Sequence, residues 1–257
     1  MTKKKKFTTL LVVDASGSMG DKIAEVIGGL KQIFADIKAD AVANPDVEMQ
    51  TIIVDFSYAK DIRIIINTSD SSLLTDKLAE SYATRGNTAL YDAIAYGFGL
   101  VPEGQDGVFV TIMTDGLEND SKVQTSITLK ELVEAKKQLG WGITFMGTTE
   151  TAVHDAVKFG VSFGNTMTFM DSADGVESAM NMSSNTRAAY YSGTVMNTSG
   201  VTMDSFQINN LIANAQGSSV VVDETTVPGL TVTPSADSFT SPIEVTFDSP
   251  VDTSATE

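Results

Sequence analysis

The stretch LLVVDASGSMGDK, residues 10–22, decides the fold of this sequence. Four consecutive apolar residues run directly into Asp14, Ser16 and Ser18, which are separated by small residues, and a helical pattern follows over about residues 21–40. An uninterrupted apolar run is typical of a strand that is buried on both faces of a parallel sheet. Three oxygen-bearing side chains therefore stand at alternate positions where this strand would end.

Apolar runs alternate with segments of helical period over residues 1–193, which predicts a doubly wound α/β fold with a mainly parallel six-stranded sheet and helices on both faces. The predicted strands are residues 7–13, 48–56, 62–66, 108–114, 142–147 and 166–170. The predicted helices are about residues 21–40, 73–82, 89–100, 129–139, 150–159 and 174–190. The link between 48–56 and 62–66 is too short for a crossover, so these two strands should pair antiparallel at one edge of the sheet.

Several helix ends have recognisable signals. Thr128 and Glu131 have the spacing of a capping box. Gly140 and Gly160 are expected to end their helices, and Gly193 is expected to end the last one.

Residues 194–257 differ in composition from the rest of the chain. They contain no lysine or arginine, eight acidic residues and four of the six prolines. The segment is rich in Ser, Thr and Asn and has short β-prone pieces but no helical period. We therefore predict two parts, a domain over residues 1–193 and an acidic, β-prone tail over residues 194–257.

Charge and composition limit the classes of function. The chain has 33 acidic and 17 basic residues and a formal net charge of −16, which argues against binding to nucleic acid or to an anionic membrane. Without cysteine there is no disulfide or thiolate metal site. The basic start resembles a secretory signal, but Asp14 interrupts its short apolar run. No segment has the roughly 20 apolar residues needed to span a bilayer, so we expect a soluble, cytoplasmic protein.

Oxygen ligands recur at three predicted strand or helix ends. The first strand leads to Asp14, Ser16 and Ser18, the strand in VFVTIMTDG leads to Asp115, and the loop TRGNTALYDAI places Thr88 before a helix. In doubly wound sheets, ligands bind beyond the carboxyl ends of the strands. Carboxylates and hydroxyls without His or Cys form a hard site that selects Mg²⁺, Mn²⁺ or Ca²⁺.

The combination of DASGS, NTALYD and TDG resembles the metal-ion-dependent adhesion site of von Willebrand factor type A (VWA) domains, a D-x-S-x-S motif with a distant Thr and a distant Asp. The resemblance covers roughly residues 7–190. It implies that Ser16, Ser18 and Thr88 coordinate the cation directly, while Asp14 and Asp115 act largely through water. Gly17 and Gly20 would allow a tight backbone turn around the ion.

Each of these residues also has an ordinary structural explanation. Asp-x-Ser-x-Ser before a helix can be an N-cap, and Thr88 and Asp115 can be cap or turn residues. Capping alone does not explain why three separate loops all supply the residues of one motif, so the metal site is the preferred interpretation. Three further polar residues lie near the motif and are candidates for supporting contacts or caps: Asp92, Glu118 and Asn119.

Three functions are compatible with the sequence. The leading hypothesis is a non-enzymatic module whose cation captures a Glu or Asp of a partner protein. A Mg²⁺-dependent phosphohydrolase is disfavoured, because no second Asp follows Asp14 by two residues and no phosphate-binding loop is present.

The third hypothesis is a structural component of a phage or other large assembly, with self-association through the tail. Residues 229–250 resemble the opening strands of small immunoglobulin-like β modules of bacterial and phage surface proteins, so the tail would hold a partial module. Residues 143–169 resemble compact intracellular and phage-encoded VWA proteins. This resemblance implies a location in the host cytoplasm, or in the virion if the protein is phage-encoded.

Overall fold

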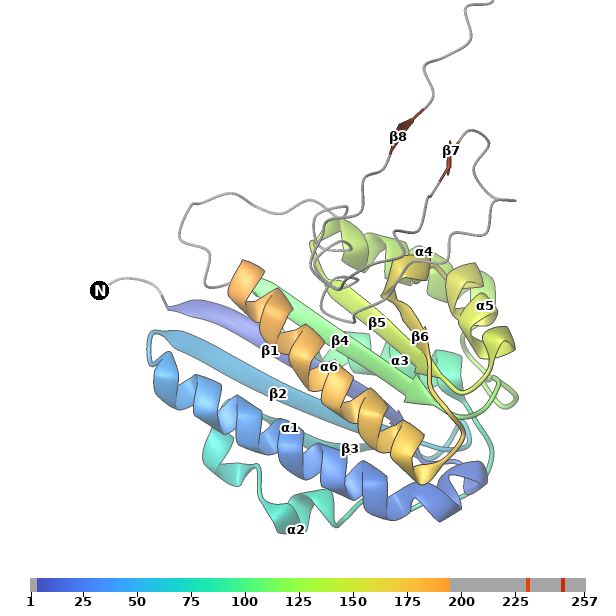
Figure 1. The fold of residues 1–257 in the computed structure, drawn as a ribbon, viewed down its shortest axis with the longest axis horizontal. Helices are drawn as coiled ribbons and strands as arrows, with labels where there is room; N and C mark the ends of the chain where they lie inside the picture. Colours follow the sequence, from blue (N-terminus) through green and yellow to red (C-terminus); the bar gives the residue numbers. More distant parts are fainter. Residues whose placement is uncertain (1–3, 195–229, 232–245, 248–257) are drawn as a thin grey trace, which may run out of the picture. The chain divides into compact units, whose positions relative to one another are not determined.

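The main domain is built on one six-stranded sheet with the order β3-β2-β1-β4-β5-β6. The computed structural model describes residues 4–194 together with residues 230–231 and 246–247. The strands of the sheet are β1 (Lys5–Asp14), β2 (Val47–Phe56), β3 (Ile62–Thr68), β4 (Gly107–Thr114), β5 (Gly142–Gly147) and β6 (Thr166–Thr168). Figure 1 shows these strands side by side, with helices packed on the sheet.

Strand pairing confirms the predicted mixed sheet. β1 pairs in parallel with both β2 and β4, and β5 pairs in parallel with β4 and β6. Only β3 runs antiparallel, against β2 at the edge, with an irregularity between Ile53 and Val54. The chain fills the sheet outward from β1 to β3 and then returns to β4 on the other side of β1. The strand order therefore reverses between β1 and β4.

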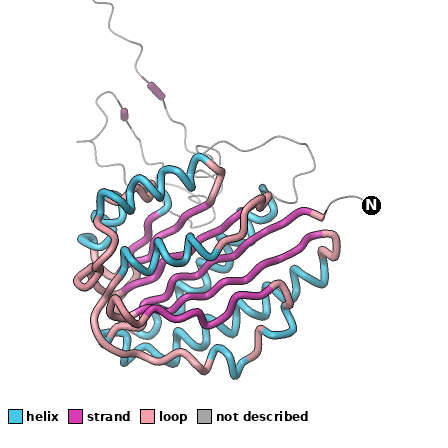
Figure 2. Tube along the Cα trace, turned by 180° about the vertical axis from the view of Figure 1, so that it is seen from behind, coloured by secondary structure: helices cyan, strands magenta, loops and turns pink. Residues whose placement is uncertain are grey.

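Helices cover both faces of the sheet. They are α1 (Ile23–Ala43), α2 (Asp76–Ala79), α3 (Leu90–Leu100), α4 (Ser126–Gln138), α5 (Glu150–Lys158) and α6 (Ala173–Thr194), with 3-10 turns η1 (Gly17–Lys22), η2 (Ser71–Leu73) and η3 (Phe163–Asn165). Figures 1 and 2 show α1 and α6 across one face, with α2 beside α1, and α3 on the opposite face. The core on that opposite face also includes residues of α4 and α5.

Alternation along β1 explains the two-sided covering. Leu10 and Val12 belong to a core shared with α3, α4 and α5, whereas Leu11 and Val13 belong to a second core shared with α1 and α6. All four side chains are buried. Because successive side chains of a strand point to opposite faces, a continuous apolar run needs a hydrophobic layer on each side.

Some predicted element boundaries were wrong. The segment 73–82 is not one helix; only Asp76–Ala79 is helical, after the 3-10 turn η2. The capping box at the start of α4 pairs Thr125 with Thr128, not Thr128 with Glu131, because the first helical turn begins at Ser126. The strand predicted over 166–170 ends at Thr168.

The predicted roles of the glycines had mixed outcomes. Gly140 and Gly160 adopt positive φ angles of 79° and 99° after α4 and α5, as expected for helix stops. Gly193 does not end α6, which continues to Thr194. Gly17 and Gly20 are not among the glycines with positive φ. Gly17 instead lies close to a neighbouring loop, since an added Cβ would meet the Arg85 carbonyl oxygen at 3.4 Å.

The chain divides into two compact units, residues 1–218 and 219–257, and the second contains a small antiparallel pair, β7 (Leu230–Thr231) with β8 (Thr246–Phe247). The remainder of the predicted tail, including most of the segment that resembles an immunoglobulin-like module, lies outside the described residues. Among the residues that are described, no helix combines the length and apolar character needed to cross a membrane.

Candidate metal centre

The five residues of the predicted cation site come from three loops near the carboxyl ends of β1 and β4. Asp14 is the last residue of β1, Ser16 is the N-cap residue of η1, and Ser18 lies in the first turn of η1. Asp115 directly follows β4, and Thr88 directly precedes the N-cap residue of α3. Figure 2 shows loops gathered at this end of the sheet. β1 and β4 are the strands between which the order reverses, which is where doubly wound sheets bind ligands.

Ser18 connects the loop after β1 with the loop after β4. Its hydroxyl donates to Asp115 Oδ1 at 2.6 Å and lies 3.0 Å from Ser16 Oγ. Three of the predicted ligand side chains therefore form one continuous line of oxygens. Thr88 approaches the same loop, because a Cβ added to Gly116 would lie 3.4 Å from Thr88 Oγ1.

Asp14 is fully buried and its carboxylate has a fixed orientation. The Ser16 N–H donates to Oδ1 at 2.7 Å, and the Thr114 hydroxyl donates to Oδ2 at 2.5 Å. Burial raises the pKa of Asp14 to about 6, although the hydrogen bonds from Thr114 and Ser16 act in the opposite direction. A cation nearby would favour the ionised form of this carboxylate.

The loop that carries Thr88 is attached to the loop after β1 by main-chain hydrogen bonds. The Arg85 N–H donates to the Ala15 carbonyl at 2.7 Å, and the Gly17 N–H donates to the Gly86 carbonyl at 2.9 Å. Main-chain hydrogen bonds thus join two of the three segments that carry the predicted ligands, and the Tyr82 hydroxyl adds a hydrogen bond to the Asp14 carbonyl at 2.5 Å.

A network of ion pairs around the buried Asp55 holds the same loop from the side of β2. Asp55 is fully buried and faces two guanidinium groups, with Arg85 Nη2 at 3.0 Å and Arg63 Nε at 2.9 Å from Oδ1. Arg85 also donates to Asp61. Arg85 therefore ties the segment before Thr88 to the ends of two strands. This contact is not evident in the sequence, because its partners are distant along the chain.

The candidates for supporting contacts hold the loop after β4. Asn119 Oδ1 accepts a hydrogen bond from the Thr88 N–H at 2.9 Å. Glu118 accepts from two N–H groups further along its own loop, at 2.8 and 2.6 Å. Asp92 accepts from three successive N–H groups, those of residues 122–124. Asp92 and Glu118 thus act as caps of the loop, and Asn119 holds Thr88 in position.

Lys22 contacts two residues of the candidate site, and the sequence analysis missed it. Its side chain is 4% exposed, and its ammonium lies 3.1 Å from Asp115 Oδ2, 3.0 Å from the Ser18 carbonyl and 2.8 Å from Asp171 Oδ1. Burial alone would lower the pKa of Lys22, but hydrogen bonds to Asp171, Asp115 and Asp21 outweigh it and raise the pKa. A signal was available: a lysine at the start of a helix faces the positive end of the helix dipole and therefore needs a compensating partner.

The donor set fits a small hard cation. Within the described part of the chain, no three His, Cys, Asp or Glu side chains come together to hold a metal. A cation at this site would therefore depend on the hydroxyls of Ser16, Ser18 and Thr88 in addition to Asp14 and Asp115. Such an oxygen-only set suits Mg²⁺ or Mn²⁺, which retain several water ligands in proteins.

Comparison with known proteins defines the class of fold. No protein-family model matches the sequence, and no curated protein matches it. Solved structures do share the fold, which is VWA-like.

Three of these structures illustrate the similarity. The pilus adhesin SpaC from Lactobacillus rhamnosus GG matches with a TM-score of 0.55 and 16% identity, over 71% of this chain and 30% of SpaC. The vWF domain of the type V pili tip protein Mfa5 from Porphyromonas gingivalis matches with a TM-score of 0.54 and 10% identity, over 69% of this chain and 95% of that domain. The SpRpn10 VWA domain matches with a TM-score of 0.50 and 14% identity, over 68% and 93%. The chain thus spans under a third of SpaC but corresponds to nearly the whole of the two isolated domains.

Proposed function

We propose that this protein is a non-enzymatic interaction module that binds a divalent cation at the carboxyl ends of β1 and β4 and uses it to capture a carboxylate of a partner protein. The observation that carries the proposal is the line of oxygens from Ser16 through Ser18 to Asp115, which joins two loops at the point where the strand order reverses. An N-cap alone does not account for a serine bonded to an aspartate 97 residues away.

The residues of the site would have two different roles in binding Mg²⁺ or Mn²⁺. Ser16, Ser18 and Thr88 would offer neutral hydroxyl oxygens, and Asp14 and Asp115 would balance charge through water. A cation bound there supplies an open coordination position for an incoming carboxylate oxygen. Three neutral donors leave much of the ionic charge uncompensated, which favours an anionic ligand.

The structural neighbours support an interaction role over catalysis. SpaC is a pilus adhesin and Mfa5 is a pili tip protein. The geometry supports the same view, because Asp92 in the first turn of α3 and Glu118 in the loop after β4 both accept hydrogen bonds from backbone groups. A general base would need a free carboxylate facing a substrate.

The charge of the chain restricts the partner. With a net charge of −16, the protein repels acidic surfaces at long range. We therefore infer a partner whose acidic ligand residue lies within a basic surface, and an association rate that falls as salt rises. Specificity would come from the surrounding surface, because a single bridged carboxylate is common to many proteins.

The first test measures metal binding. Isothermal titration of the full chain with Mn²⁺ should show one site, which Ser18→Ala weakens by about tenfold or more, since one direct ligand and the link to Asp115 are lost. Ser69→Ala is the matched control, because Ser69 is an exposed serine beyond the end of β3. Equal Mn²⁺ affinity in wild type and Ser18→Ala would reject the site.

The second test measures partner capture. The wild-type chain and Ser18→Ala serve as baits for the proteins of its source organism, each with Mg²⁺ or with EDTA, and retained proteins are identified by mass spectrometry. A partner that is retained only by wild type with Mg²⁺, and is lost when one of its own exposed acids is replaced by alanine, supports the proposal. Retention that survives EDTA and all such replacements contradicts it.

A further inference from the structure

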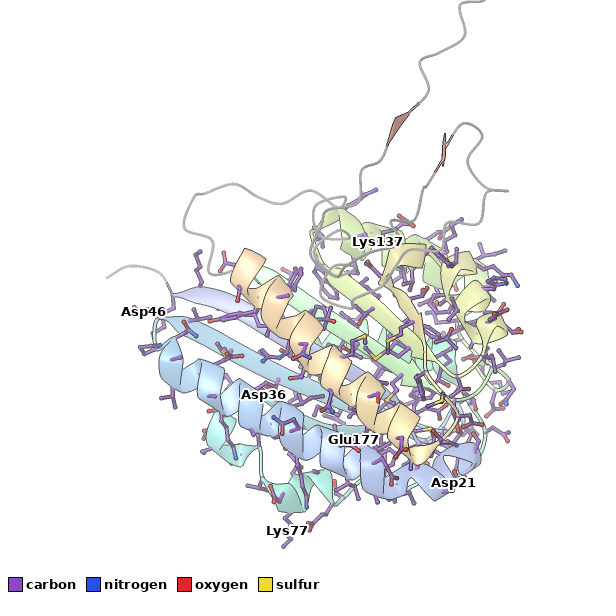
Figure 3. The ribbon with its side chains drawn as sticks, in the orientation of Figure 1. Asp21, Asp36, Asp46, Lys77, Lys137 and Glu177 are labelled. Carbon is purple, nitrogen blue, oxygen red and sulfur yellow. The ribbon has the colours of Figure 1, made fainter. Side chains whose placement is uncertain are left out.

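Lys22 brings a buried positive charge into direct contact with the candidate metal site. Its ammonium is 3.1 Å from Asp115 Oδ2, and the two side chains are 4% and 1% exposed. The same ammonium donates to the carbonyl oxygen of Ser18 at 3.0 Å. Figure 3 labels the neighbouring Asp21, which lies at the same end of the sheet near the start of α1. The Lys22 ammonium thus contacts two predicted ligand residues, Asp115 at its carboxylate and Ser18 at its backbone carbonyl.

The position of Lys22 is unfavourable for a lysine in two respects. Taking an ammonium out of water costs several kcal/mol unless strong partners compensate it. Lys22 also lies at the N-terminal end of α1, where the helix dipole disfavours a positive charge. Two of its carboxylate partners, Asp21 and Asp171, are 82% and 63% exposed, so water screens those pairs. The buried carboxylate of Asp115 is therefore the partner that matters most.

The contact with Lys22 divides the two oxygens of Asp115 between different roles. Oδ2 accepts from the ammonium, and Oδ1 accepts from the Ser18 hydroxyl. Only one oxygen of Asp115 is thus directed toward the serine donors. The ammonium also cancels one of the two negative charges that Asp14 and Asp115 bring to the site.

We propose that Lys22 is a positioning residue that limits the affinity of the site for the cation and preserves its affinity for an anionic ligand. The inference rests on the proposed function. When only the buried groups Asp14, Asp115 and Lys22 are counted, the ionised site has a net charge of −1, and a bound divalent ion makes it +1; the exposed carboxylates of Asp21 and Asp171 are screened by water. Without the ammonium the loaded site would be neutral, and Asp115 Oδ2 would be available to accept a hydrogen bond from metal-bound water. Lys22 therefore lowers the affinity of the site for the cation and raises the affinity of the loaded site for a carboxylate.

The test compares Mn²⁺ binding to the full chain and to Lys22→Gln, which keeps a hydrogen-bond donor but removes the charge. Lys31→Gln is the matched control, because Lys31 pairs with Glu80 at 2.7 Å on the outer side of α1 and its loss changes the net charge equally. At close range in a partly buried site, repulsion between the ammonium and the cation should raise the dissociation constant for Mn²⁺ by about tenfold or more. Lys22→Gln removes this repulsion and should bind Mn²⁺ at least about tenfold more tightly. Lys31→Gln should remain within about twofold of wild type, because exposed charges are screened.

The direction of the change separates this role from a purely structural one. A lysine that only supports the fold would, when replaced, loosen the site and weaken Mn²⁺ binding. Tighter binding by Lys22→Gln supports the proposal, and equal or weaker binding by a variant with a native circular dichroism spectrum overturns it. If wild type itself binds no Mn²⁺ at millimolar concentration, the proposed function fails, and that outcome is distinct from equal binding by wild type and variant.

The anion part of the proposal has its own measurement. Acetate is titrated into the Mn²⁺-loaded chain, and relaxation of the water protons reports the loss of metal-bound water. Wild type should exchange water for acetate at a concentration at least about threefold lower than Lys22→Gln, because its loaded site keeps a positive charge. The same midpoint in both proteins would overturn this part.

Two other variants protect the test against misfolding. Lys22→Met keeps the aliphatic stem and should reproduce the tighter Mn²⁺ binding of Lys22→Gln. Asp171→Asn should leave the core unchanged, because the Asp171 side chain is largely exposed. It removes a carboxylate that partly neutralises the Lys22 ammonium, so the ammonium repels the cation more strongly. It should weaken Mn²⁺ binding by about twofold to threefold; unchanged or tighter binding would contradict the role of Lys22.

Discussion

Asp14 and Asp115 are both buried carboxylates, but their partners differ in charge. Asp14 accepts hydrogen bonds from the neutral groups of Ser16 and Thr114, whereas Asp115 lies against the ammonium of Lys22. Burial without a cationic partner is what raises the pKa of Asp14 to about 6. The charge of Asp14 should therefore be visible in the stability of the metal-free protein.

We predict that Asp14→Asn is more stable than wild type at pH 7.5 in metal-free buffer. The folded-state pKa of Asp14 lies above the ordinary aspartate value of 3.8, so the stabilisation from protonated Asp14 is fully present below pH 4 and is lost as the pH rises through about 6. At about 1.4 kcal/mol per pKa unit, the difference between the two proteins should reach about 3 kcal/mol at pH 7.5 and vanish near pH 4. Urea unfolding at both pH values measures it, and a difference that does not depend on pH would contradict the assignment.

The five candidate ligands could be predicted from the sequence because they follow strands or precede a helix in short motifs. The contacts that adjust the site could not. Lys22 meets Asp115 only because β1 and β4 are neighbours, and Arg85 meets Asp55 only because the loop before α3 returns to the end of β2. Such contacts depend on tertiary structure and leave little trace in local sequence patterns.

Among the elements, the strands were predicted well and the shortest helix poorly. Strands β1, β2 and β4 each contain an apolar run, and all of β4 together with residues 7–14 of β1 and 51–56 of β2 is buried, so sequence and burial agree there. In the segment 73–82, apolar residues also have helical spacing, but Leu73 is exposed and Thr75 caps a new turn. A capping residue within the segment divides it, and periodicity alone does not detect the division.

Two adjacent glycines of α1 offer a matched test of how this helix packs against α6. A Cβ on Gly29 would lie 2.4 Å from Met180 Cβ, whereas a Cβ on Gly28 would have no atom within 4 Å. We expect Gly29→Ala to lower the free energy of unfolding by about 1 to 3 kcal/mol, because the helices would have to separate. Gly28→Ala should raise it by up to about 1 kcal/mol through helix propensity. Thermal and urea unfolding of both variants check the pair, and equal effects would show that α1 and α6 are not in close contact.

The loop before α3 should depend on Arg85 more than on Arg63. Arg85→Met leaves Asp55 buried with one cationic partner and releases the loop that carries Thr88, so we expect a loss of about 3 kcal/mol in stability and weaker Mn²⁺ binding. Arg63→Met removes a more exposed guanidinium that does not belong to this loop. It should have the smaller effect on both stability and Mn²⁺ affinity. Calorimetric titration and urea unfolding give the two quantities, and a larger effect of Arg63→Met on Mn²⁺ binding would refute the assignment.

At the scale of the whole molecule, the order of elements along the chain accounts for the position of the site. A chain that builds a sheet outward from β1 and then returns to its other side leaves the ends of β1 and β4 without a crossing connection between them. The sequence predicted a mainly parallel sheet with ligand residues beyond its strand ends, because apolar runs and helical segments alternate, but it did not predict the order of the strands. The carboxyl-terminal boundary of the main domain is less clear from the sequence, since Gly193 was predicted to end the last helix but α6 continues to Thr194.

The boundary between the two predicted parts can be tested by shortening the chain at two positions. The end of α6 belongs to the core of the main domain: Tyr191 packs edge-on against Phe7 with ring centroids 5.0 Å apart, and Tyr190 lies 5.5 Å from Phe109 and donates to the Gly140 carbonyl. A chain of residues 1–194 should therefore unfold cooperatively and bind Mn²⁺ as the full chain does.

A chain that ends at residue 189 loses both tyrosines and should be less stable by more than about 3 kcal/mol, because removing one buried aromatic side chain already costs that much. Urea unfolding of the two shortened chains beside the full chain measures the difference. If the chain of residues 1–194 unfolds without cooperativity, the tail contributes to the core and the predicted boundary at residue 193 is wrong. If both shortened chains are as stable as the full chain, the aromatic contacts at the end of α6 do not stabilise the domain, and its boundary lies nearer the amino terminus.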